Sequence, residues 1–505
     1  MPTAASFLSI DVGRNSLSLV LLGAGGEVVA TLSRAYASEV QAAVDPQDWW
    51  RAARTAIKEL LRRSHRSATS IRSIGVTGES GGFVALDKDG KALCPTVIGP
   101  DPRAEAYAEQ LVRQVGPRNM LNLASGLPTS ASTAAKLLWL RDHEKRVWHD
   151  LAHVLPPKDF LRFRLTDVLA TDPSDATATL LYNPRSRSWS KQLITSLDIH
   201  AEWLPVVGAG GAIAGRVTAS AARETGLQAG TPVVTGAAHL AAAAIAVGAA
   251  TPGTATIELG GHGALLVPTT EAVRDPSARL GTGCHAIANL WTLVGSDFAG
   301  AQTLGWLMEQ ILPSEVQQAR RLRREPLEAL TELASEVPPG SDGLLFLPPA
   351  LYPQIAGFVG LTNAHRRGHL VRSVLESGAL AVRQALAALG DARQPSTYAV
   401  TGEHAGNTLW CQIVADALDQ PVRATPCADA NAIGVALLAG TAVGIYKSLD
   451  DARAKLSLGT TTYQPRKAAA GAYAALMPVL ARLTASLRAG QPQPAPALMS
   501  AEASG

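Results

Sequence analysis

The first thirty residues alternate short apolar runs with small or polar turn residues. Apolar runs occupy residues 7–13, 16–22 and 28–33, and a glycine-rich turn at 23–27 separates the last two. Short apolar runs bounded by glycine are typical of β-strands joined as hairpins. Farther on, Trp50, Ala53, Ile57 and Leu60 follow helical spacing. The chain is therefore predicted to begin with a hairpin and a long amphipathic helix.

A similar pattern returns in the second half of the chain. Residues 231–248 predict a strand leading into an alanine-rich helix, and 255–268 predict a glycine-turned hairpin like the first. Helices are expected at 370–389 and 407–418, with a strand at 396–402 between them. Repetition of one supersecondary unit predicts an internal duplication. The expected fold class is α/β, with two similar domains.

The length of 505 residues exceeds what a single hydrophobic core supports. We predict an N-terminal domain over 1–248 and a C-terminal domain over 249–485. Residues 486–505 are rich in proline and alanine and are expected to form a disordered tail.

Composition narrows the classes of partner. Lysine and arginine total 45 against 42 acidic residues, a net charge of +3 without a basic stripe, so no nucleic-acid or membrane partner is expected. The N-terminus has no basic segment followed by a cleavage site, and the four cysteines lack metal-ligand spacing. These features predict a cytoplasmic protein that acts on a small molecule.

Several phrases in order along residues 6–465 resemble the FGGY carbohydrate kinases, including xylulokinases. They include IDVGRNSLSLVLL, IGVTGESGGFVALDKDG, LPPKDFLRFRLTDVLATDPSDA and TGEHAGNTLWCQIVADAL. The resemblance implies two duplicated ribonuclease-H-like domains, of the actin, hexokinase and Hsp70 type, around a central cleft. It places the sugar on the N-terminal side and the nucleotide on the C-terminal side. A homodimer is a further possibility that it raises.

The phosphate-binding turns depart from the family pattern. The first turn keeps Asp11 and Gly13, but Arg14 stands where the family has threonine. The second hairpin has glycine–glycine–histidine–glycine instead of Gly-Thr-Ser-Gly, and Glu403 replaces a glycine in the adenosine loop. A carboxylate there should disfavour ATP. The candidate nucleotide contacts are Gly13, Gly260, Gly261, Gly263, Gly402, Glu403, His404 and Asn407.

The sugar side and the catalytic base are changed as well. His239 stands where the resemblance places the aspartate that takes the proton from the sugar hydroxyl. Imidazole titrates near neutrality and can serve as a general base. The family's Gln-Met-His is Glu79-Ser80-Gly81 here, and Gly99 replaces a tryptophan. The candidate catalytic residues are His239, Glu79 and Asp11, and the candidate substrate contacts are Arg14, Ser80, Asp101, Arg103 and His262.

Three functions fit these observations. The preferred interpretation is an enzyme that uses His239 and Glu79 as acid and base on a polyol, a sugar or a larger small molecule, without ATP-dependent phosphoryl transfer. The second is an active xylulose-like kinase with His239 as base, which would need ATP and Mg²⁺; Asp11 is the one candidate metal ligand. The third is a non-catalytic ligand-binding protein. Arg14, His262 and His239 are expected to form a cationic patch.

Overall fold

The computed structural model describes residues 5–36, 43–275, 280–296, 298, 300–348, 356–390 and 393–489. Contacts divide the chain into two compact units. The first comprises Met1–Ser296, Ala385–Gly406 and Val422–Thr462, and the second comprises Asp297–Gln384, Asn407–Pro421 and Tyr463–Gly505. The predicted boundary at 248/249 falls between the last strand of one large sheet and the first strand of the other. The two compact units do not divide at this position, so the predicted domain bounds stay a prediction.

The first sheet has the strand order β11-β12-β4-β1-β2-β3, and β13 also pairs with β4. Its central strand β1 runs antiparallel to β2 and parallel to β4. The strands are β1 (Ser6–Val12), β2 (Ser16–Gly23), β3 (Val28–Ala35), β4 (Ile71–Gly78), β11 (Ile213–Arg216), β12 (Pro232–Val234) and β13 (Ala237–Ala238).

The second sheet repeats this arrangement, with the order β16-β17-β15-β14-β20-β21-β22. Here β14 runs antiparallel to β15 and parallel to β20, as β1 does to β2 and β4. The repeated topology confirms the predicted duplicated α/β fold. The strands are β14 (Thr254–Glu258), β15 (Ala264–Thr269), β16 (Gly281–Cys284), β17 (Trp291–Ser296), β20 (Thr397–Thr401), β21 (Val422–Ala424) and β22 (Thr461–Tyr463).

Short strands outside the two sheets form four pairs or bridges of their own. Strand β5 pairs with β6, and residues 85–93 also turn back on themselves, where the Leu93 N–H donates to the Ala85 carbonyl at 2.9 Å and Leu86 bridges to Ala92. The pairs join β5 (Val84–Leu86) to β6 (His153–Leu155), β7 (Ala170–Thr171) to β10 (Val206–Val207), β8 (Tyr182–Asn183) to β9 (Ser188–Trp189) and β18 (Leu345–Leu347) to β19 (Gly357–Val359).

Helix α1 (Pro46–Ser64) shows how the sequence pattern produces local structure. Asp45 caps its N-terminus by accepting from the Gln47 N–H, and Pro46 occupies the first turn, where its missing N–H costs nothing. Trp50, Ala53, Ile57 and Leu60 are buried as their spacing predicts. Burying each of the larger side chains contributes roughly 1.5–3 kcal/mol.

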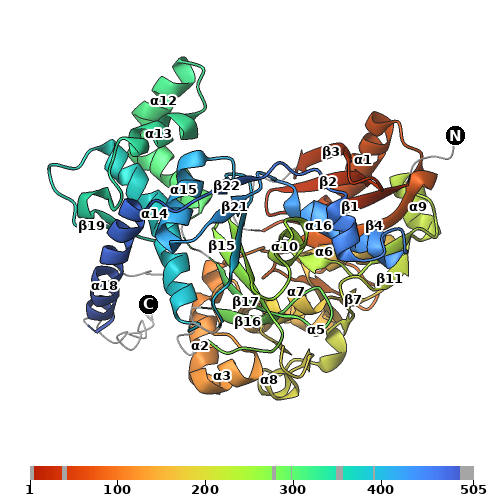
Figure 1. Cartoon of the computed structure of the whole chain (residues 1–505). Helices are drawn as coiled ribbons and strands as arrows, with labels where there is room; N and C mark the ends of the chain where they lie inside the picture. The colour runs from red at the N-terminus through yellow and green to blue at the C-terminus, as the bar shows by residue number, and fades with distance from the viewer. Residues whose placement is uncertain are drawn as a thin grey trace. The chain divides into compact units, whose positions relative to one another are not determined.

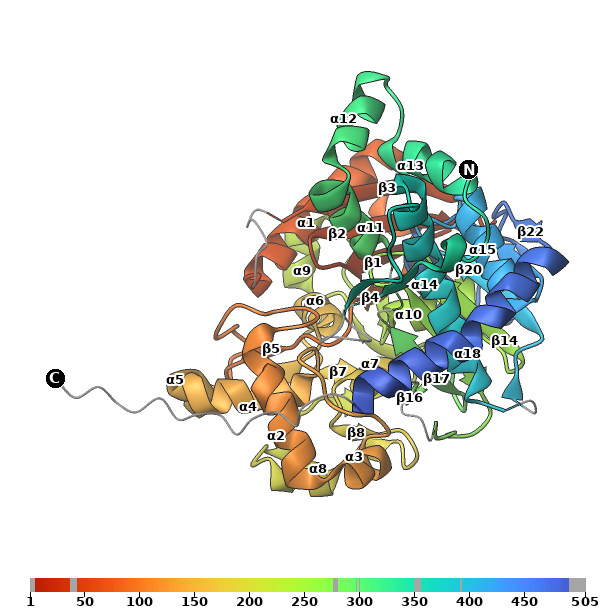
Figure 2. The same cartoon turned by 90° about the vertical axis from the view of Figure 1, so that its left-hand side faces the viewer.

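Helices fill the rest of the first unit. Figure 1 shows α16, late in the sequence and blue, beside the early red strands β1 and β2. Figure 2 shows α2, α3 and α4 gathered together. The helices are α2 (Glu105–Val115), α3 (Pro117–Leu123), α4 (Thr133–His143), α5 (Lys145–Asp150), α6 (Pro157–Thr166), α7 (Pro173–Ala178), α8 (Lys191–Ser196), α9 (Ala219–Thr225), α10 (His239–Ala246), α16 (Ala430–Ala442) and α17 (Leu449–Ala454).

The second unit is mainly helical. Its core includes Arg372, whose Nε donates to Glu376 Oε1 at 2.7 Å, and Tyr473, whose hydroxyl donates to the same oxygen at 2.8 Å. The helices are α11 (Ala301–Trp306), η4 (Leu307–Ile311), α12 (Pro313–Arg321), α13 (Pro326–Ser335), α14 (Arg367–Ala387, which ends in the first unit), α15 (Thr408–Leu418) and α18 (Lys467–Ala489).

The C-terminal helix bears on two predictions. Helix α18 continues to Ala489, so the first residues of the predicted tail are helical; residues 490–505 lie outside the described residues. Over Lys467–Ser486 it is long and apolar enough to cross a membrane by length and composition. One such helix among the described residues is weak evidence, and the absence of a membrane partner stays a prediction.

Candidate active site

Three polar side chains from distant parts of the first unit meet at the end of β1. His239 Nε2 lies 2.7 Å from Asp11 Oδ1, and Asn431 Nδ2 donates to Asp11 Oδ2 at 2.9 Å. The His239 and Asp11 side chains are 28% and 14% exposed. Both carboxylate oxygens of Asp11 are therefore engaged, and His239 retains access from outside.

Close packing of two alanine-rich helices brings these residues together. His239 is the first residue of α10, and Asn431 lies in the first turn of α16. A Cβ added at Gly434 would lie 1.8 Å from the carbonyl oxygen of Ala242, so the two helices could not approach this closely with a larger residue there. The contact aligns both helix N-termini with the end of β1.

The charge of Asp11 controls the protonation of His239. Burial alone would lower the pKa of His239, but the charge of Asp11 and its hydrogen bond raise it to about 9, with smaller contributions from Glu79 and Glu258. A cation at a helix N-terminus is otherwise unfavourable, so the ion pair must also offset the dipole of α10. At neutral pH the pair is imidazolium and carboxylate.

More carboxylates face this pair. Burial, followed by the charges of Glu79 and Asp11, raises the pKa of Glu258, and His239 opposes the shift. Burial and Asp11 likewise raise the pKa of Asp429. The charge of Glu79 thus acts on His239, its predicted acid–base partner. The oxygens of Glu79 contact Arg14 rather than His239.

Arg14 points toward the sugar-side loop. Its backbone N–H donates to Glu79 Oε1 at 3.4 Å, and its Nε lies 3.8 Å from Glu79 Oε2. A Cβ added at Gly99 would lie 2.0 Å from Arg14 Nη2, so the guanidinium covers the residue that replaces the family's tryptophan. Arg14 is paired with Glu79 and His239 with Asp11, and the expected cationic patch of these two residues with His262 stays a prediction.

We predict that Gly99→Ala destabilises the protein by displacing Arg14. Gly99 has φ of +78°, where a Cβ adds about 1–2 kcal/mol of backbone strain, and the contact with Arg14 adds a smaller cost, because the end of this flexible side chain can move. Gly230→Ala is the matched control, since Gly230 has φ of +85° and no atom within 4 Å of an added Cβ. Chemical denaturation should show a larger loss for Gly99→Ala, and equal losses would contradict the Arg14 contact.

Asp101 and Arg103 satisfy each other. Asp101 Oδ1 accepts from the Arg103 backbone at 3.1 Å and from its Nε at 3.0 Å, and Oδ2 accepts from Nη2 at 2.9 Å. Burial would raise the pKa of Asp101, but the bonds and charge of Arg103 lower it. The guanidinium carbon also stacks 4.2 Å from the Trp139 ring centroid. Asp101 caps the short helix that follows it, and the contact of the pair with substrate stays a prediction.

Asp175 holds the Ser80 side chain, because the Ser80 hydroxyl donates to Asp175 Oδ1 at 2.7 Å. Lys136, which the sequence did not single out, supports the same region by donating to the carbonyls of Gly81, Val97 and Gly99. Burial lowers the pKa of Lys136 to about 8, and Asp101 opposes that shift. The sugar-side loops are therefore held by buried groups.

The candidate nucleotide contacts divide between the two units. Gly13 closes the β1–β2 turn, and Gly260, Gly261, His262 and Gly263 form the β14–β15 turn. Gly402 and His404 follow β20, where the His404 N–H donates to the Leu259 carbonyl at 3.0 Å, and Glu403 is exposed. Asn407 lies in the second unit, caps α15 and donates to Thr331 Oγ1 at 2.9 Å.

Asn431 and Glu258 were also missed from the sequence alone. Asn431 begins an apolar helix, and Glu258 is the charged residue at the end of a buried strand just before the second glycine turn. A polar residue at the boundary of an apolar element was the available signal for both. Neither position indicates by itself which distant side chain it meets.

Comparison with known proteins identifies the family. Residues 6–246 match the N-terminal domain and 255–443 the C-terminal domain of the FGGY family of carbohydrate kinases. Xylulose kinase of Escherichia coli K12 is 28% identical over 486 residues, covering 91% of this chain and 97% of that protein. Gluconokinase of Bacillus licheniformis is 24% identical, covering 95% and 96%. The structure of xylulose kinase from Rhodospirillum rubrum superimposes with a TM-score of 0.85 at 30% identity, covering 96% and 99%.

The chain belongs to the FGGY family of carbohydrate kinases and is an enzyme with its two-domain α/β fold. Family membership favours the second of the three functions inferred from the sequence, the active carbohydrate kinase, over the preferred interpretation without phosphoryl transfer. The central cleft, a cytoplasmic location and a homodimer stay predictions.

Proposed function

We propose that this chain is an ATP-dependent kinase of a xylulose-like sugar and that the Asp11–His239 pair supplies its general base. The observation that carries the proposal is the 2.7 Å contact between His239 Nε2 and Asp11 Oδ1. A carboxylate that accepts from one imidazole nitrogen orients the ring and leaves the other nitrogen for a substrate proton. In this arrangement Nδ1 is the nitrogen available to the sugar hydroxyl.

The reaction then needs three changes at the sugar. The hydroxyl gives its proton to His239 Nδ1, its oxygen forms a bond to the terminal phosphorus of ATP, and the bond from that phosphorus to ADP breaks. Phosphoryl transfer depends mainly on positioning and electrostatics, so imidazole can replace carboxylate as the base. Sugars resembling xylulose are proposed because the similar proteins include xylulose kinases along most of the chain.

The residues of the candidate site suit the phosphates of a nucleotide better than they suit a metal ion. The glycine turns at Gly13 and Gly261 leave backbone without side chains, and an added Cβ at Gly261 would meet no atom within 4 Å, which suits close approach of phosphates. Nothing comparable supports magnesium: the described residues contain no group of three metal-ligating side chains, and both oxygens of Asp11 already accept hydrogen bonds. The residues do not fit a magnesium ion bound directly to Asp11.

The proposal predicts an alkaline pH dependence of turnover. His239 must be neutral to accept a proton, and with its pKa at about 9 only about one molecule in a hundred is neutral at pH 7. Turnover should therefore rise about tenfold per pH unit from pH 7 and level off above about 9. The measurement is ADP release from ATP with a panel of ketoses, aldoses and aldonates between pH 6 and 10. No sugar-dependent release at any pH would contradict the kinase assignment and favour an enzyme without phosphoryl transfer.

A further inference from the structure

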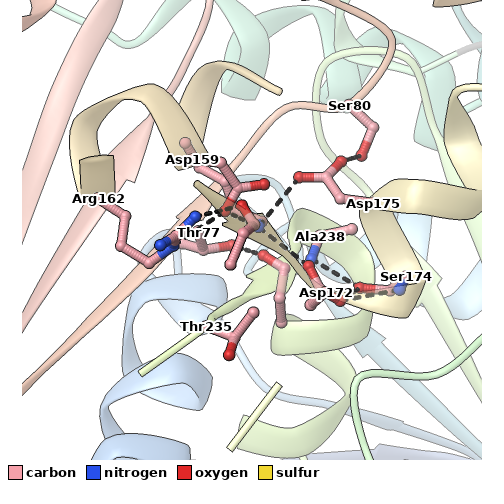
Figure 3. Close-up of polar contacts among 12 residues, drawn as sticks. Thr77, Ser80, Asp159, Arg162, Asp172, Ser174, Asp175, Thr235 and Ala238 are labelled. Atoms are coloured by element: carbon pink, nitrogen blue, oxygen red, sulfur yellow. Dashed lines mark hydrogen bonds and ion pairs between the residues drawn. The ribbon is translucent and has the colours of Figure 1, made fainter. Parts of the chain in front are cut away.

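A buried cluster of charges lies behind the predicted sugar-side loop. The Nζ atom of Lys158 is 2.9 Å from Asp159 Oδ1, 3.0 Å from Asp172 Oδ1 and 3.4 Å from Asp175 Oδ2. Arg162 Nε lies 3.3 Å from Asp159 Oδ1, and all five side chains are at most 2% exposed. Figure 3 shows the three carboxylates converging from α6 and the first turn of α7.

The cluster holds three carboxylates against two cations, so it carries an excess of negative charge when all are ionised. Burial raises the pKa of Asp175 to about 7, the charges of Asp172 and Asp159 add to that shift, and Lys158 opposes it. A cluster selected for stability alone would not need the third carboxylate, because an unbalanced buried charge is costly. The position of Asp175 therefore calls for another explanation.

Two consecutive side chains of α7 connect this cluster to both halves of the site. Asp175 Oδ1 accepts from the Ser80 hydroxyl at 2.7 Å, next to Glu79. Ser174 Oγ accepts from the Ala238 N–H at 2.9 Å, next to His239, and donates to Asp172. Figure 3 shows Ser80 next to Asp175 and Ala238 next to Ser174.

The same two segments also meet directly in the first sheet. Strand β13 pairs with the end of β4 through Ala237 with Thr77 and Ala238 with Gly78. The Thr77 hydroxyl donates to the Ala237 carbonyl at 2.8 Å. The strand pairing fixes Ala238 against Gly78. Ser174 holds the same Ala238, directly before His239, and Asp175 holds Ser80, two residues beyond the end of β4.

We propose that Ser174 and Asp175 are positioning residues that hold the Ser80 loop and the start of α10 at one separation, and so present the sugar hydroxyl to His239. Neither side chain needs to touch the substrate. The inference rests on the proposed kinase function for its effect on turnover. Its effect on His239 itself does not depend on turnover.

Three variants test the two connections separately. Ser174→Ala removes the acceptor of the Ala238 N–H, and Asp175→Ala removes the acceptor of Ser80 without altering Ser80. Asp175→Asn keeps an oxygen that can accept from Ser80 while removing the charge. Ser73→Ala is the matched control: this buried serine also lies on the first sheet, in β4, and donates to the Ala439 carbonyl at 2.7 Å, a group outside the candidate site.

We expect Ser174→Ala to lower kcat and Asp175→Ala to raise KM for the sugar, each changing kcat/KM by roughly 10- to 100-fold. Asp175→Asn should restore KM to within a few-fold of the natural protein. Ser73→Ala should lower the free energy of unfolding about as much as Ser174→Ala does, because each variant loses one hydrogen bond of a serine hydroxyl. It should leave both kinetic constants within about twofold of those of the natural protein. Equal losses in Asp175→Ala and Asp175→Asn, or kinetic constants in Ser174→Ala and Asp175→Ala like those of Ser73→Ala, would overturn the proposal.

A second readout needs no turnover. NMR titration of histidine-labelled protein, with His239→Gln to assign the resonance, reports the pKa of His239. In Ser174→Ala the pKa should fall toward its ordinary value, because the contact with Asp11 loosens; in Ser73→Ala it should not change. An unchanged pKa in folded Ser174→Ala would refute the role of Ser174. If the natural protein shows no kinase activity, the proposed function is refuted but the positioning role is not. The pKa of His239 in Ser174→Ala and in Ser73→Ala still tests that role.

Discussion

His239→Asp should turn over sugar faster than the natural protein at pH 7, by about tenfold or more. The imidazole is mostly protonated at that pH because Asp11 raises its pKa to about 9. A carboxylate has an ordinary pKa near 4 and is available as a base throughout the neutral range. Repulsion from Asp11 will raise the pKa of the new carboxylate, but a shift of two units would still leave it ionised at pH 7. Initial rates of ADP release against pH provide the measurement.

The two proteins should converge as the pH approaches 9, since His239 then loses its proton. His239→Ala is the control without a base, and its plateau turnover should fall by roughly 10²- to 10⁴-fold. A His239→Asp variant that is folded but slower than the natural protein at pH 7 would show that the histidine contributes something other than proton acceptance. Natural and His239→Ala proteins of equal activity would remove His239 from the mechanism.

Lys158→Met should destabilise the protein by at least about 3–5 kcal/mol, the range for removing one partner of a buried ion pair. The three carboxylates around Lys158 Nζ would lose the cation that balances them. Burial opposes the charge of Lys158, yet these carboxylates hold its pKa above the ordinary value. Chemical denaturation at pH 7.5 should report the loss, which reduced soluble expression would accompany.

The loss in Lys158→Met should shrink as the pH falls. Burial raises the pKa of Asp175 and the charge of Lys158 opposes that shift, so without the cation the pKa of Asp175 rises further above its unfolded value. Such groups favour the folded state most below their unfolded pKa near 4, and this contribution is lost as the pH rises. Lys136→Met is the matched control, because Lys136 is also buried but donates to carbonyls, so its loss should be smaller, about 1–3 kcal/mol. Its pH dependence should also be weaker, because the carboxylate that acts on Lys136 is Asp101 rather than a cluster of three. Equal losses at every pH would contradict the electrostatic explanation.

Part of the candidate site could be predicted from the sequence. Asp11 and His239 stand at the ends of strongly apolar elements, where a polar residue is exceptional, and both were identified. Glu79 and Ser80 are likewise polar residues directly after an apolar element, the buried strand β4. The resemblance to the FGGY family, together with the position of each residue beside an apolar element, selected these candidates.

The sequence did not predict the directions in which the side chains point. Arg14 follows a phosphate-type turn in the sequence, yet its guanidinium covers Gly99, 85 positions away along the chain. Asn431 reaches Asp11 because α10 and α16 pack at the distance that Gly434 and Ala242 permit. Such contacts depend on small residues that a sequence pattern does not distinguish from ordinary helix formers.

Local order was thus determined by the sequence itself: apolar runs and glycine turns specify two copies of one α/β unit, because burial and backbone freedom act over a few residues. The pairing of His239 with Asp11 was decided only in the tertiary structure. That pairing changes the imidazole from a group that titrates near neutrality to one that stays charged until about pH 9. Coulomb interactions depend on distance in space, and that distance exists only once the helices have packed.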